Sequence, residues 1–143
     1  MTKTVRIYTD GGSRGNPGPS GLGVAIFAIK KDGSDGELLA TVHEYLGKTT
    51  NNQAEYMAII RGLERAKELQ VEEVEMVMDS ELAVKQLNGQ YRVKNQDLAK
   101  RFIEVYNLRM KFKKVTFKHV RREFNKDADA LVNKAIDEAL YKS

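Results

Sequence analysis

The sequence contains neither cysteine nor tryptophan, and its 143 residues include only two prolines and two histidines. Without cysteine the chain can form neither disulfides nor thiolate metal sites, which suits a reducing compartment such as the cytoplasm. The histidines, His43 and His119, lie far apart in the sequence, so we expect both to be structural and expect no histidine-rich zinc site. Any metal ion would instead be held by carboxylates, which suit hard cations such as Mg²⁺ and Mn²⁺.

Long apolar runs are absent too. No run approaches the roughly 18–20 residues of a membrane span, and the first residues lack the basic-then-apolar pattern of a signal peptide. We therefore expect no membrane association and a cytoplasmic location. Hydrophobic residues make up 41% of the chain and charged residues 31%, proportions that are typical of a soluble globular protein. The length predicts a single domain, residues 1–143, and we expect a monomer because nothing indicates an obligate oligomer.

The patterning of apolar residues predicts strands and helices in a definite order. Alternating and β-branched residues indicate strands over Thr4–Thr9, Leu22–Lys30, Glu37–Leu46, Val71–Met78 and Lys113–Val120. Helical spacing indicates helices over Asn51–Leu69, Ser80–Leu87, Asn95–Met110 and Lys126–Tyr141. Turn residues predict a loop over Gly11–Ser20 and a hairpin turn over Lys31–Gly36. This order predicts an α/β fold with a five-stranded mixed sheet flanked by helices, in which an antiparallel meander leads into a parallel part.

Two aspartates follow predicted strands directly. Asp10 closes the first predicted strand and Asp79 closes the fourth. In mixed α/β sheets, binding sites collect at the carboxyl ends of parallel strands. If these two strands are parallel neighbours, we expect the two carboxylates to lie side by side, about 5 Å apart.

Two further acids begin the apolar faces of predicted helices. Glu55 begins one apolar stripe and Asp129 begins another. The two stripes continue through Ile59, Gly62, Ala66 and Leu69 and through Val132, Ile136 and Leu140. Acidic side chains rarely face a core unless they are paired or coordinate a metal. Both acids are therefore candidates for a functional site.

Each of these four acids also has an ordinary structural explanation. Asp10 could belong to a turn, Asp79 could help to cap a helix, Asp129 could complement a helix dipole, and Glu55 could lie at an exposed stripe edge. The structural account needs four separate explanations to be true at once, whereas a single metal site accounts for all four acids. Crowded carboxylates need counter-charge, and a pair of divalent cations would provide it, activating water and stabilising a leaving oxygen in phosphoryl chemistry. The formal net charge of +4 is compatible with a polyanionic substrate.

Five motifs make the chain resemble ribonuclease H of type 1 over nearly its whole length. They are YTDGGSRGNPG from Tyr8, TTNNQAEYMA at Thr49–Ala58, MDSELAV at Met78–Val84, KNQDL at Lys94–Leu98 and NKDADALVNKA at Asn125–Ala135. The resemblance implies an enzyme that uses two Mg²⁺ or Mn²⁺ ions to cleave the RNA strand of RNA/DNA hybrids, leaving 3′-hydroxyl and 5′-phosphate ends. It implies that the metal ligands are the four acids already singled out: Asp10, Glu55, Asp79 and Asp129.

The resemblance also implies contacts with the substrate. Positions near the RNA backbone are matched by Gly11, Gly12, Ser13, Asn16 and Ser80. Amides that contact bases and 2′-hydroxyls in the minor groove, where RNA differs from DNA, are matched by Asn51 and Asn52. A pocket for a phosphate of the DNA strand is matched by Lys48, Thr50 and Asn95. The family often has arginine at the first of these three positions, so the lysine here implies a less bidentate grip.

Two departures from the family pattern affect the expected function. Many members have a basic, tryptophan-containing protrusion where this chain has only the short connector Asn88–Lys94, so we expect weaker binding of the hybrid. Many also carry a mobile histidine shortly before the last aspartate, where this chain has Arg122. Arginine cannot exchange a proton near neutral pH. We therefore expect Arg122 to stabilise developing negative charge or to assist product release.

Two other functions are compatible with the sequence. The short connector could relax the demand for a DNA strand, so that the enzyme also or mainly cleaves double-stranded RNA, whose geometry is similarly A-like. The chain could also be a catalytically silent module that binds hybrids. Lost acids mark such relatives, whereas all four acids are present here.

Overall fold

The computed structural model describes residues 4–141, in which there are five strands, four α-helices and one short 3₁₀ helix. The strands are β1 (Thr4–Ser13), β2 (Gly18–Ile29), β3 (Asp35–Thr49), β4 (Glu73–Met78) and β5 (Lys114–His119). The helices are α1 (Asn51–Glu68), α2 (Glu81–Leu87), α3 (Gln96–Arg109), the 3₁₀ helix η1 (Arg122–Phe124) and α4 (Lys126–Tyr141). The predicted order of strands and α-helices is confirmed, and η1 is an addition to it.

The strands form one mixed sheet in the order β3-β2-β1-β4-β5. β1, β2 and β3 make an antiparallel meander, and β4 runs parallel to both β1 and β5. The predicted five-stranded mixed sheet is therefore confirmed. So is the parallel pairing of the first and fourth strands, on which the predicted meeting of Asp10 and Asp79 depends.

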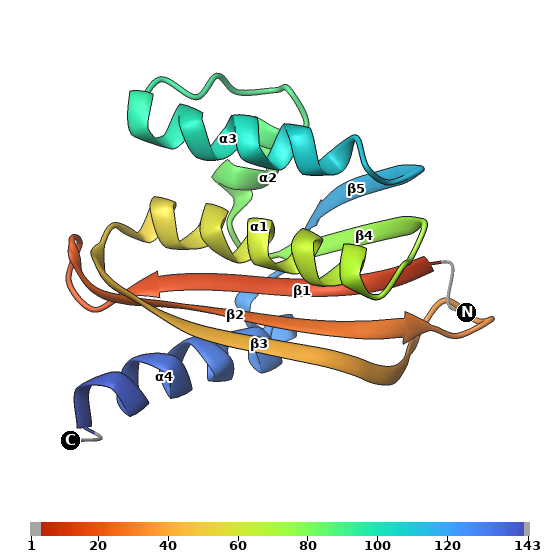
Figure 1. The fold of residues 1–143 in the computed structure, drawn as a ribbon, viewed down its shortest axis with the longest axis horizontal. Helices are drawn as coiled ribbons and strands as arrows, with labels where there is room; N and C mark the ends of the chain where they lie inside the picture. The colour runs from red at the N-terminus through yellow and green to blue at the C-terminus, as the bar shows by residue number, and fades with distance from the viewer. Residues whose placement is uncertain (1–3, 142–143) are drawn as a thin grey trace.

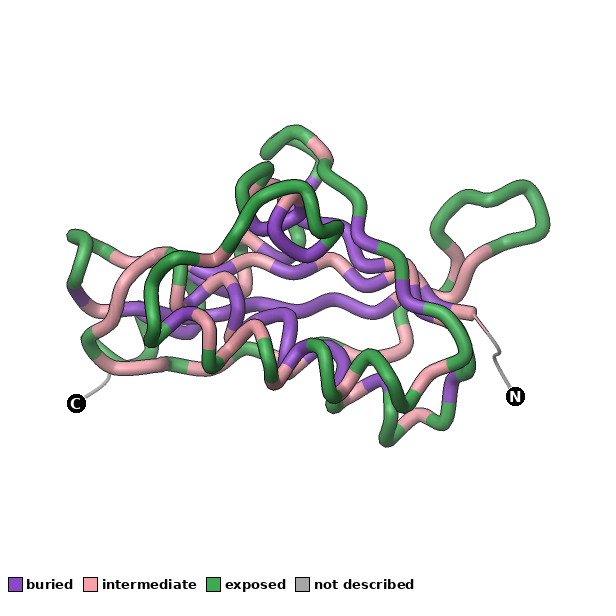
Figure 2. The backbone as a smooth tube through the Cα atoms, turned by 90° about the horizontal axis from the view of Figure 1, so that it is seen from above, coloured by how far each residue is buried: buried purple, intermediate pink, exposed green. Residues whose placement is uncertain are grey.

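Helices cover both faces of this sheet (Figure 1). α1 and α3 lie on one face, and α4 lies on the other against β2 and β3. Buried backbone runs along the central strands and the inner sides of the helices (Figure 2). One polar pair is enclosed in this core, where the Tyr56 hydroxyl donates to Gln86 Oε1 at 2.7 Å and joins α1 to α2. Within residues 4–141, no helix combines the length and the apolar character needed to cross a membrane.

The predicted loop over Gly11–Ser20 is wrong at both ends. β1 continues to Ser13 and β2 already begins at Gly18, so only residues 14–17 connect them. The extended backbone persists because β2 pairs with it residue by residue, with Gly11 opposite Leu22. Glycines that indicate a turn in the sequence thus lie within paired strands. The remaining boundary differences are shifts of a few residues and leave the topology unchanged.

Candidate active site

Asp10 lies at the point where the parallel ladder ends. The prediction that it closes its strand is wrong in detail, because β1 runs on to Ser13 through its pairing with β2. The pairing of β1 with β4, however, ends with Thr9 opposite Met78. Asp10 and Asp79 directly follow this last pair in the sequence. The two acids are therefore neighbours at the carboxyl end of the parallel pair, as predicted.

Glu55 is delivered by the first turns of α1, which approach β1 closely. A Cβ atom on Gly11 would lie 2.2 Å from the Ala54 carbonyl carbon and 2.4 Å from the backbone nitrogen of Glu55. Only glycine permits this approach. The start of the helix is set by Thr50, whose Oγ1 accepts a hydrogen bond from the Gln53 N–H at 3.2 Å.

Asp129 is delivered by the first turn of α4, on the other face of the sheet. A Cβ atom on Gly23, which pairs with Asp10, would lie 2.2 Å from a backbone carbonyl oxygen of α4. Buried Asn125 fixes the start of α4, because its Nδ2 donates to the Thr9 carbonyl oxygen at 2.9 Å. Its own carbonyl oxygen accepts the Asp129 N–H at 3.1 Å. One glycine on each side of the sheet thus lets a helix carry its acid up to Asp10.

The cap of α2 decides between the two explanations of Asp79. The N-cap residue is Ser80, whose Oγ accepts the Ala83 N–H at 3.2 Å, so Asp79 is free to face the site. The Ser80 side chain also lies close to Glu55 and lowers the pKa of that carboxyl group. The contact of Ser80 with RNA stays a prediction.

The four acids line one open pocket of about 570 Å³. The other lining residues are Gly11, Gly12, Ser13, Arg14, Asn51, Arg122, Val132, Asn133 and Ile136. Arg122 reaches the pocket from η1; its side chain is 82% exposed and its Nη2 lies 3.7 Å from Asp129 Oδ1. The structure therefore brings together all five predicted catalytic residues.

Burial and mutual repulsion disfavour the charged forms of two of these acids. Burial, followed by the charges of Asp79, Asp129 and Glu55, raises the pKa of Asp10 to about 8. Burial also raises the pKa of Glu55 to about 7; Asp79 adds to that rise, and the Ser80 side chain opposes it. The folded chain thus resists full ionisation of the site near neutral pH.

The donor set suits a hard divalent cation. Carboxylate oxygens are the ligands that Mg²⁺ and Mn²⁺ prefer, and a cation would relieve the repulsion that raises the pKa of Asp10. As they stand, no three acidic or histidine side chains within residues 4–141 are placed closely enough to hold an ion. The structure therefore gathers suitable donors around one pocket without forming a ligand cage.

Two asparagines tie the tip of the β1–β2 hairpin to the start of α1. Asn51 Oδ1 accepts the Ser13 N–H at 2.8 Å, and Asn16 Oδ1 accepts the Asn51 N–H at 3.1 Å. Ser13 Oγ donates to the carbonyl oxygens of Gly15 and of Thr49, the latter at 3.1 Å. These contacts hold the hairpin tip beside the acids. The contacts of its residues with RNA stay predictions.

A second groove, of about 680 Å³, lies between the hairpin tip, α1 and α3. Its lining includes four predicted substrate contacts: Asn16, Thr50, Asn52 and Asn95. Asn95 is the N-cap of α3, and its Oδ1 accepts the Leu98 N–H at 3.0 Å. Lys48 is exposed on β3 and lines neither this groove nor the acid pocket. The structure therefore brings Thr50 and Asn95 together and leaves Lys48 outside.

Among the residues of the site that sequence reasoning missed, two make contacts with distant segments. Asn125 anchors α4 to β1, and within residues 4–141 its buried Oδ1 has no hydrogen-bond partner. Arg14 lines the acid pocket and forms an ion pair with Asp137 at 2.8 Å. Neither residue stands out in a sequence, because polar residues in turns and before helices are usually exposed. Their roles become visible only through contacts with distant segments.

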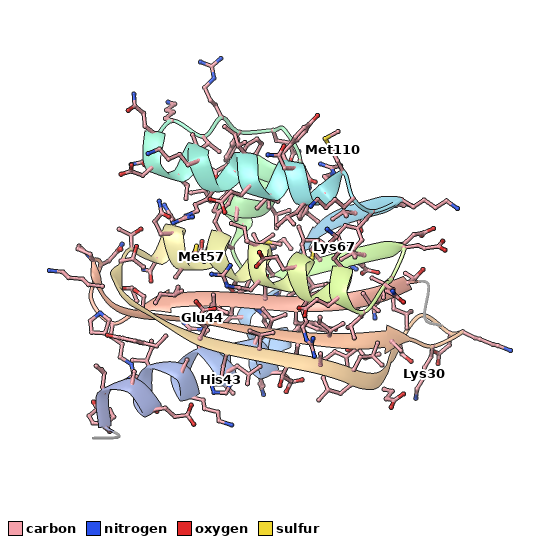
Figure 3. The ribbon with its side chains drawn as sticks, viewed as in Figure 1. Lys30, His43, Glu44, Met57, Lys67 and Met110 are labelled. Atoms are coloured by element: carbon pink, nitrogen blue, oxygen red, sulfur yellow. The ribbon has the colours of Figure 1, made fainter. Side chains whose placement is uncertain are left out.

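Neither the histidines nor the α2–α3 connector lines the acid pocket. His43 Nε2 is 2.8 Å from Glu138 Oε1, where β3 meets α4 (Figure 3). Neither His43 nor His119 lines the acid pocket. Residues 88–95, between α2 and α3, contain no helix or strand. The place of the family's protrusion is therefore taken by a short connector, as the sequence predicted.

Comparisons with known proteins agree with this geometry. The chain matches a family model described as "Reverse transcriptase-like" over residues 8–135. Ribonuclease HI of Halobacterium salinarum is 38% identical over 135 residues, which are 94% of this chain and 65% of that protein. Ribonuclease H of Pseudomonas fluorescens is 34% identical over 96% of this chain and 95% of that protein. A bifunctional protein of Mycobacterium tuberculosis is 39% identical, but the chain spans only 36% of its length.

Solved structures share both the fold and a substantial part of the sequence. The N-terminal RNase H domain of the Mycobacterium tuberculosis protein has a TM-score of 0.86 and 40% identity, over 94% of this chain and 99% of the other. LC11-RNase H1, solved in complex with an RNA/DNA hybrid, has a TM-score of 0.87 and 45% identity, over 95% of this chain and 99% of the other. On the level and the extent of these similarities, the chain belongs to the ribonuclease H type 1 family.

Proposed function

We propose that this protein is a metal-dependent endoribonuclease that hydrolyses the RNA strand of RNA/DNA hybrids, leaving 5′-phosphate and 3′-hydroxyl ends. The observation that carries the proposal is the convergence of four acids, from four different segments of the chain, on one open pocket beside the hairpin tip. The substrate class is supported by LC11-RNase H1, a relative solved with an RNA/DNA hybrid.

The four acids would hold two Mg²⁺ ions, or Mn²⁺ in their place. Bound there, such ions activate a water molecule and stabilise the leaving oxygen, which is the chemistry that phosphodiester hydrolysis needs. The chain itself holds the four acids in position. Asp10 lies on a paired strand, and Gly11 and Gly23 let the starts of α1 and α4 pack against that strand. Rigid elements of this kind keep the ligands near one another before an ion binds and draws them together.

The polar groups around the pocket would orient the substrate. Residues assigned to the RNA backbone are Gly11, Gly12, Ser13, Asn16 and Ser80. Asn51 and Asn52 would contact bases and 2′-hydroxyls, and through the latter they would distinguish RNA from DNA. Thr50 and Asn95 would receive a phosphate of the DNA strand, which Lys48 would approach from outside the groove. Arg122, at the rim, would stabilise negative charge as it develops or assist product release.

We further infer that residues 1–143 form one catalytic domain that acts as a monomer in the cytoplasm. The single sheet with helices on both faces supports one core, and the cysteine-free sequence suits that compartment. Light scattering after size-exclusion chromatography would check the monomer; a stable dimer at micromolar concentration would contradict it.

The experiment that tests this function follows a labelled RNA/DNA hybrid on a denaturing gel with Mg²⁺, with Mn²⁺ or with EDTA. We expect cleavage of the RNA strand with either metal and none with EDTA. Asp10→Asn should abolish cleavage without loss of folding. Asp32→Asn makes the same change in the β2–β3 turn, outside the acid pocket, and should leave activity unchanged. Full activity of Asp10→Asn would overturn the proposal.

Matched substrates in the same assay separate the two alternatives. Cleavage of double-stranded RNA at a rate equal to or above that of the hybrid would show a wider substrate range, which the short connector between α2 and α3 could allow. Binding of the hybrid that resists EDTA, with no cleavage in either metal, would indicate a silent binding module instead.

A further inference from the structure

Arg14 stands at the wall of the acid pocket, and the function proposed above gives it no role. It begins the connection between β1 and β2, residues 14–17. Its backbone N–H donates to the Pro19 carbonyl oxygen at 2.8 Å. A Cβ atom on Gly18 would lie 2.1 Å from the Arg14 carbonyl oxygen. The turn is therefore tightly packed, and it holds the Arg14 backbone in a fixed position beside the acids.

The Arg14 side chain crosses to a polar stripe on α4. Its Nη2 lies 2.8 Å from Asp137 Oδ1 and donates to Asn133 Oδ1 at 3.3 Å. Asn133 Nδ2 in turn donates to the Asp129 carbonyl oxygen at 3.2 Å. Asp129, Asn133 and Asp137 are spaced four residues apart, so they share one face of the helix. The helix that carries one of the four acids thus also orients the guanidinium.

Most of the hydrogen-bonding capacity of Arg14 is left over. Both contacts use Nη2, and within residues 4–141 neither Nε nor Nη1 has a hydrogen-bond or ion-pair partner. The side chains of Arg14 and Asp137 are 36% and 55% exposed. Water screens such a pair, so it contributes at most about 1 kcal/mol. A bidentate anion can therefore take the place of Asp137 with little loss.

The phosphates of a nucleic acid bound at the acid pocket would be such anions, and they would lie near Arg14. Arg14 and Arg122 are the only cationic residues that line the pocket within the described chain, and Arg122 is far more exposed. When one phosphodiester lies at the four acids, the adjoining phosphates of the same strand must pass along the pocket wall. Resting on the proposed function, we propose that Arg14 binds the RNA phosphate next to the one that reacts. Asp137 and Asn133 hold its guanidinium ready in the free protein.

The test measures binding of a fluorescent RNA/DNA hybrid at several salt concentrations, in an Asp10→Asn background that does not cleave. Arg14→Gln removes the charge and keeps a side chain that can hydrogen-bond to α4. We expect affinity to fall about tenfold and the slope of log K against log salt to fall by about one, since one fewer counterion is released. Arg14→Lys should keep the slope and recover part of the affinity that Arg14→Gln loses, because lysine keeps the charge but cannot bind a phosphate in the bidentate manner of a guanidinium.

Two matched variants separate a phosphate contact from a structural tie. Arg65→Gln removes the same charge from a pair with Glu68, and Arg65 does not line the pocket; it should change affinity less than about twofold. Asp137→Asn should keep or raise the affinity, because it removes a negative charge near the duplex and leaves the guanidinium in place. Equal losses for Asp137→Asn and Arg14→Gln, with an unchanged salt slope and matching drops in Tm, would overturn the inference.

The same data distinguish this inference from the proposed function. If the unmodified chain neither binds nor cleaves the hybrid, the proposed function fails and the inference fails with it. If the unmodified chain cleaves normally but Arg14→Gln behaves like Arg65→Gln, only the role of Arg14 is refuted.

Discussion

At Asp10, burial and the neighbouring carboxylates act in the same direction and raise the pKa of the side chain from 3.8 to about 8. Between these two values the folded chain holds a proton that the unfolded chain releases. The free energy of unfolding therefore falls as the pH rises through this window. In the absence of a cation, Asp10 makes the folded protein less stable at neutral and alkaline pH.

Asp10→Asn removes this ionisation while it preserves the shape of the side chain. In EDTA at pH 8, we expect the variant to be more stable than the unmodified chain by about 2 kcal/mol, which raises Tm by about 5 °C. The difference should narrow as the pH falls towards 4, where the aspartate is protonated in the folded chain and about half protonated in the unfolded chain. Calorimetry between pH 4 and pH 8 provides the measurement. A difference that does not change with pH would contradict the raised pKa.

Arg122 should influence the reaction without influencing stability. Its side chain is 82% exposed and lies 3.7 Å from Asp129, so Arg122→Ala should shift Tm by no more than about 2 °C. If the guanidinium stabilises charge at the reacting phosphate, kcat should fall about tenfold with little change in KM. Arg121→Ala is the control, because that side chain is 81% exposed and pairs with Glu123 at 3.8 Å. Steady-state kinetics that fail to separate the two variants would remove Arg122 from the site.

Among the elements, α1 and α4 make the site by approaching opposite faces of the sheet closely at two glycines. Gly11 faces the backbone of α1, and Gly23 of β2 faces the backbone of α4. In the sequence, the glycines around position 11 indicate a loop. In the structure they are strand residues whose missing side chains leave room for a helix. A glycine-rich stretch can form either a turn or a close contact between a strand and a helix. Which of the two it forms depends on the segment that packs against it.

Gly23→Ala tests whether this close approach positions Asp129. The added methyl group would lie 2.2 Å from the Ala128 carbonyl oxygen and 2.7 Å from Leu131 Cβ. It must push α4 outwards, so we expect a loss of about 2–3 kcal/mol in the free energy of unfolding. Because Asp129 moves with the helix, cleavage should fall even where the variant is fully folded. Urea denaturation and the hybrid cleavage assay measure the two effects.

Gly62→Ala is the control for that substitution. Its added methyl group would lie 3.2 Å from Ile7 Cγ2, a side-chain atom that can shift. Alanine is also favoured over glycine within a helix by about 1 kcal/mol. We therefore expect a change of less than about 1 kcal/mol and unimpaired cleavage. Equal behaviour of the two variants would mean that the approach of α4 at Gly23 is not critical.

Across the whole molecule, two structural features affect binding: the α2–α3 connector is short, and the four acids do not yet form a ligand cage. The α2–α3 connector carries no helix, so the hybrid must be held by the core face and scattered basic residues. We therefore expect weaker binding than in family members with a basic protrusion. The acids, in turn, are gathered without being formed into a ligand cage. A cation that draws them together would stabilise the fold as a whole.

Mg²⁺ should therefore raise the thermal stability of the unmodified chain. At a concentration ten times its dissociation constant, a bound ion adds about 1.4 kcal/mol, and Tm rises by about 4 °C. The rise should be larger at pH 8 than at pH 5, where protons compete for Asp10, and it should be much smaller for Asp10→Asn. Thermal melts with Mg²⁺ and with EDTA provide the measurement. An equal rise for both chains would indicate that the ion binds elsewhere.

The sequence by itself determined the order of the elements and the identity of the four acids. Apolar periodicity is a local property, so strands and helices can be predicted from neighbouring residues alone. Glu55 and Asp129 stood out because they interrupt that periodicity at the start of an apolar stripe. Asp10 and Asp79 stood out because each follows a strand-like run. The order of the elements and the four acids could thus be predicted from short stretches of the chain.

Only the tertiary structure decided how far β1 extends, what its glycines contact and which other residues belong to the site. β1 runs past Asp10 because β2 pairs with it, and Gly11 is required because α1 comes against it. Arg14 and Asn125 become part of the site through contacts with α4 and β1. Each of these features depends on segments that are distant in the sequence and meet only after folding. Such contacts cannot be predicted from local sequence patterns, because without their distant partners the same residues would lie on the surface.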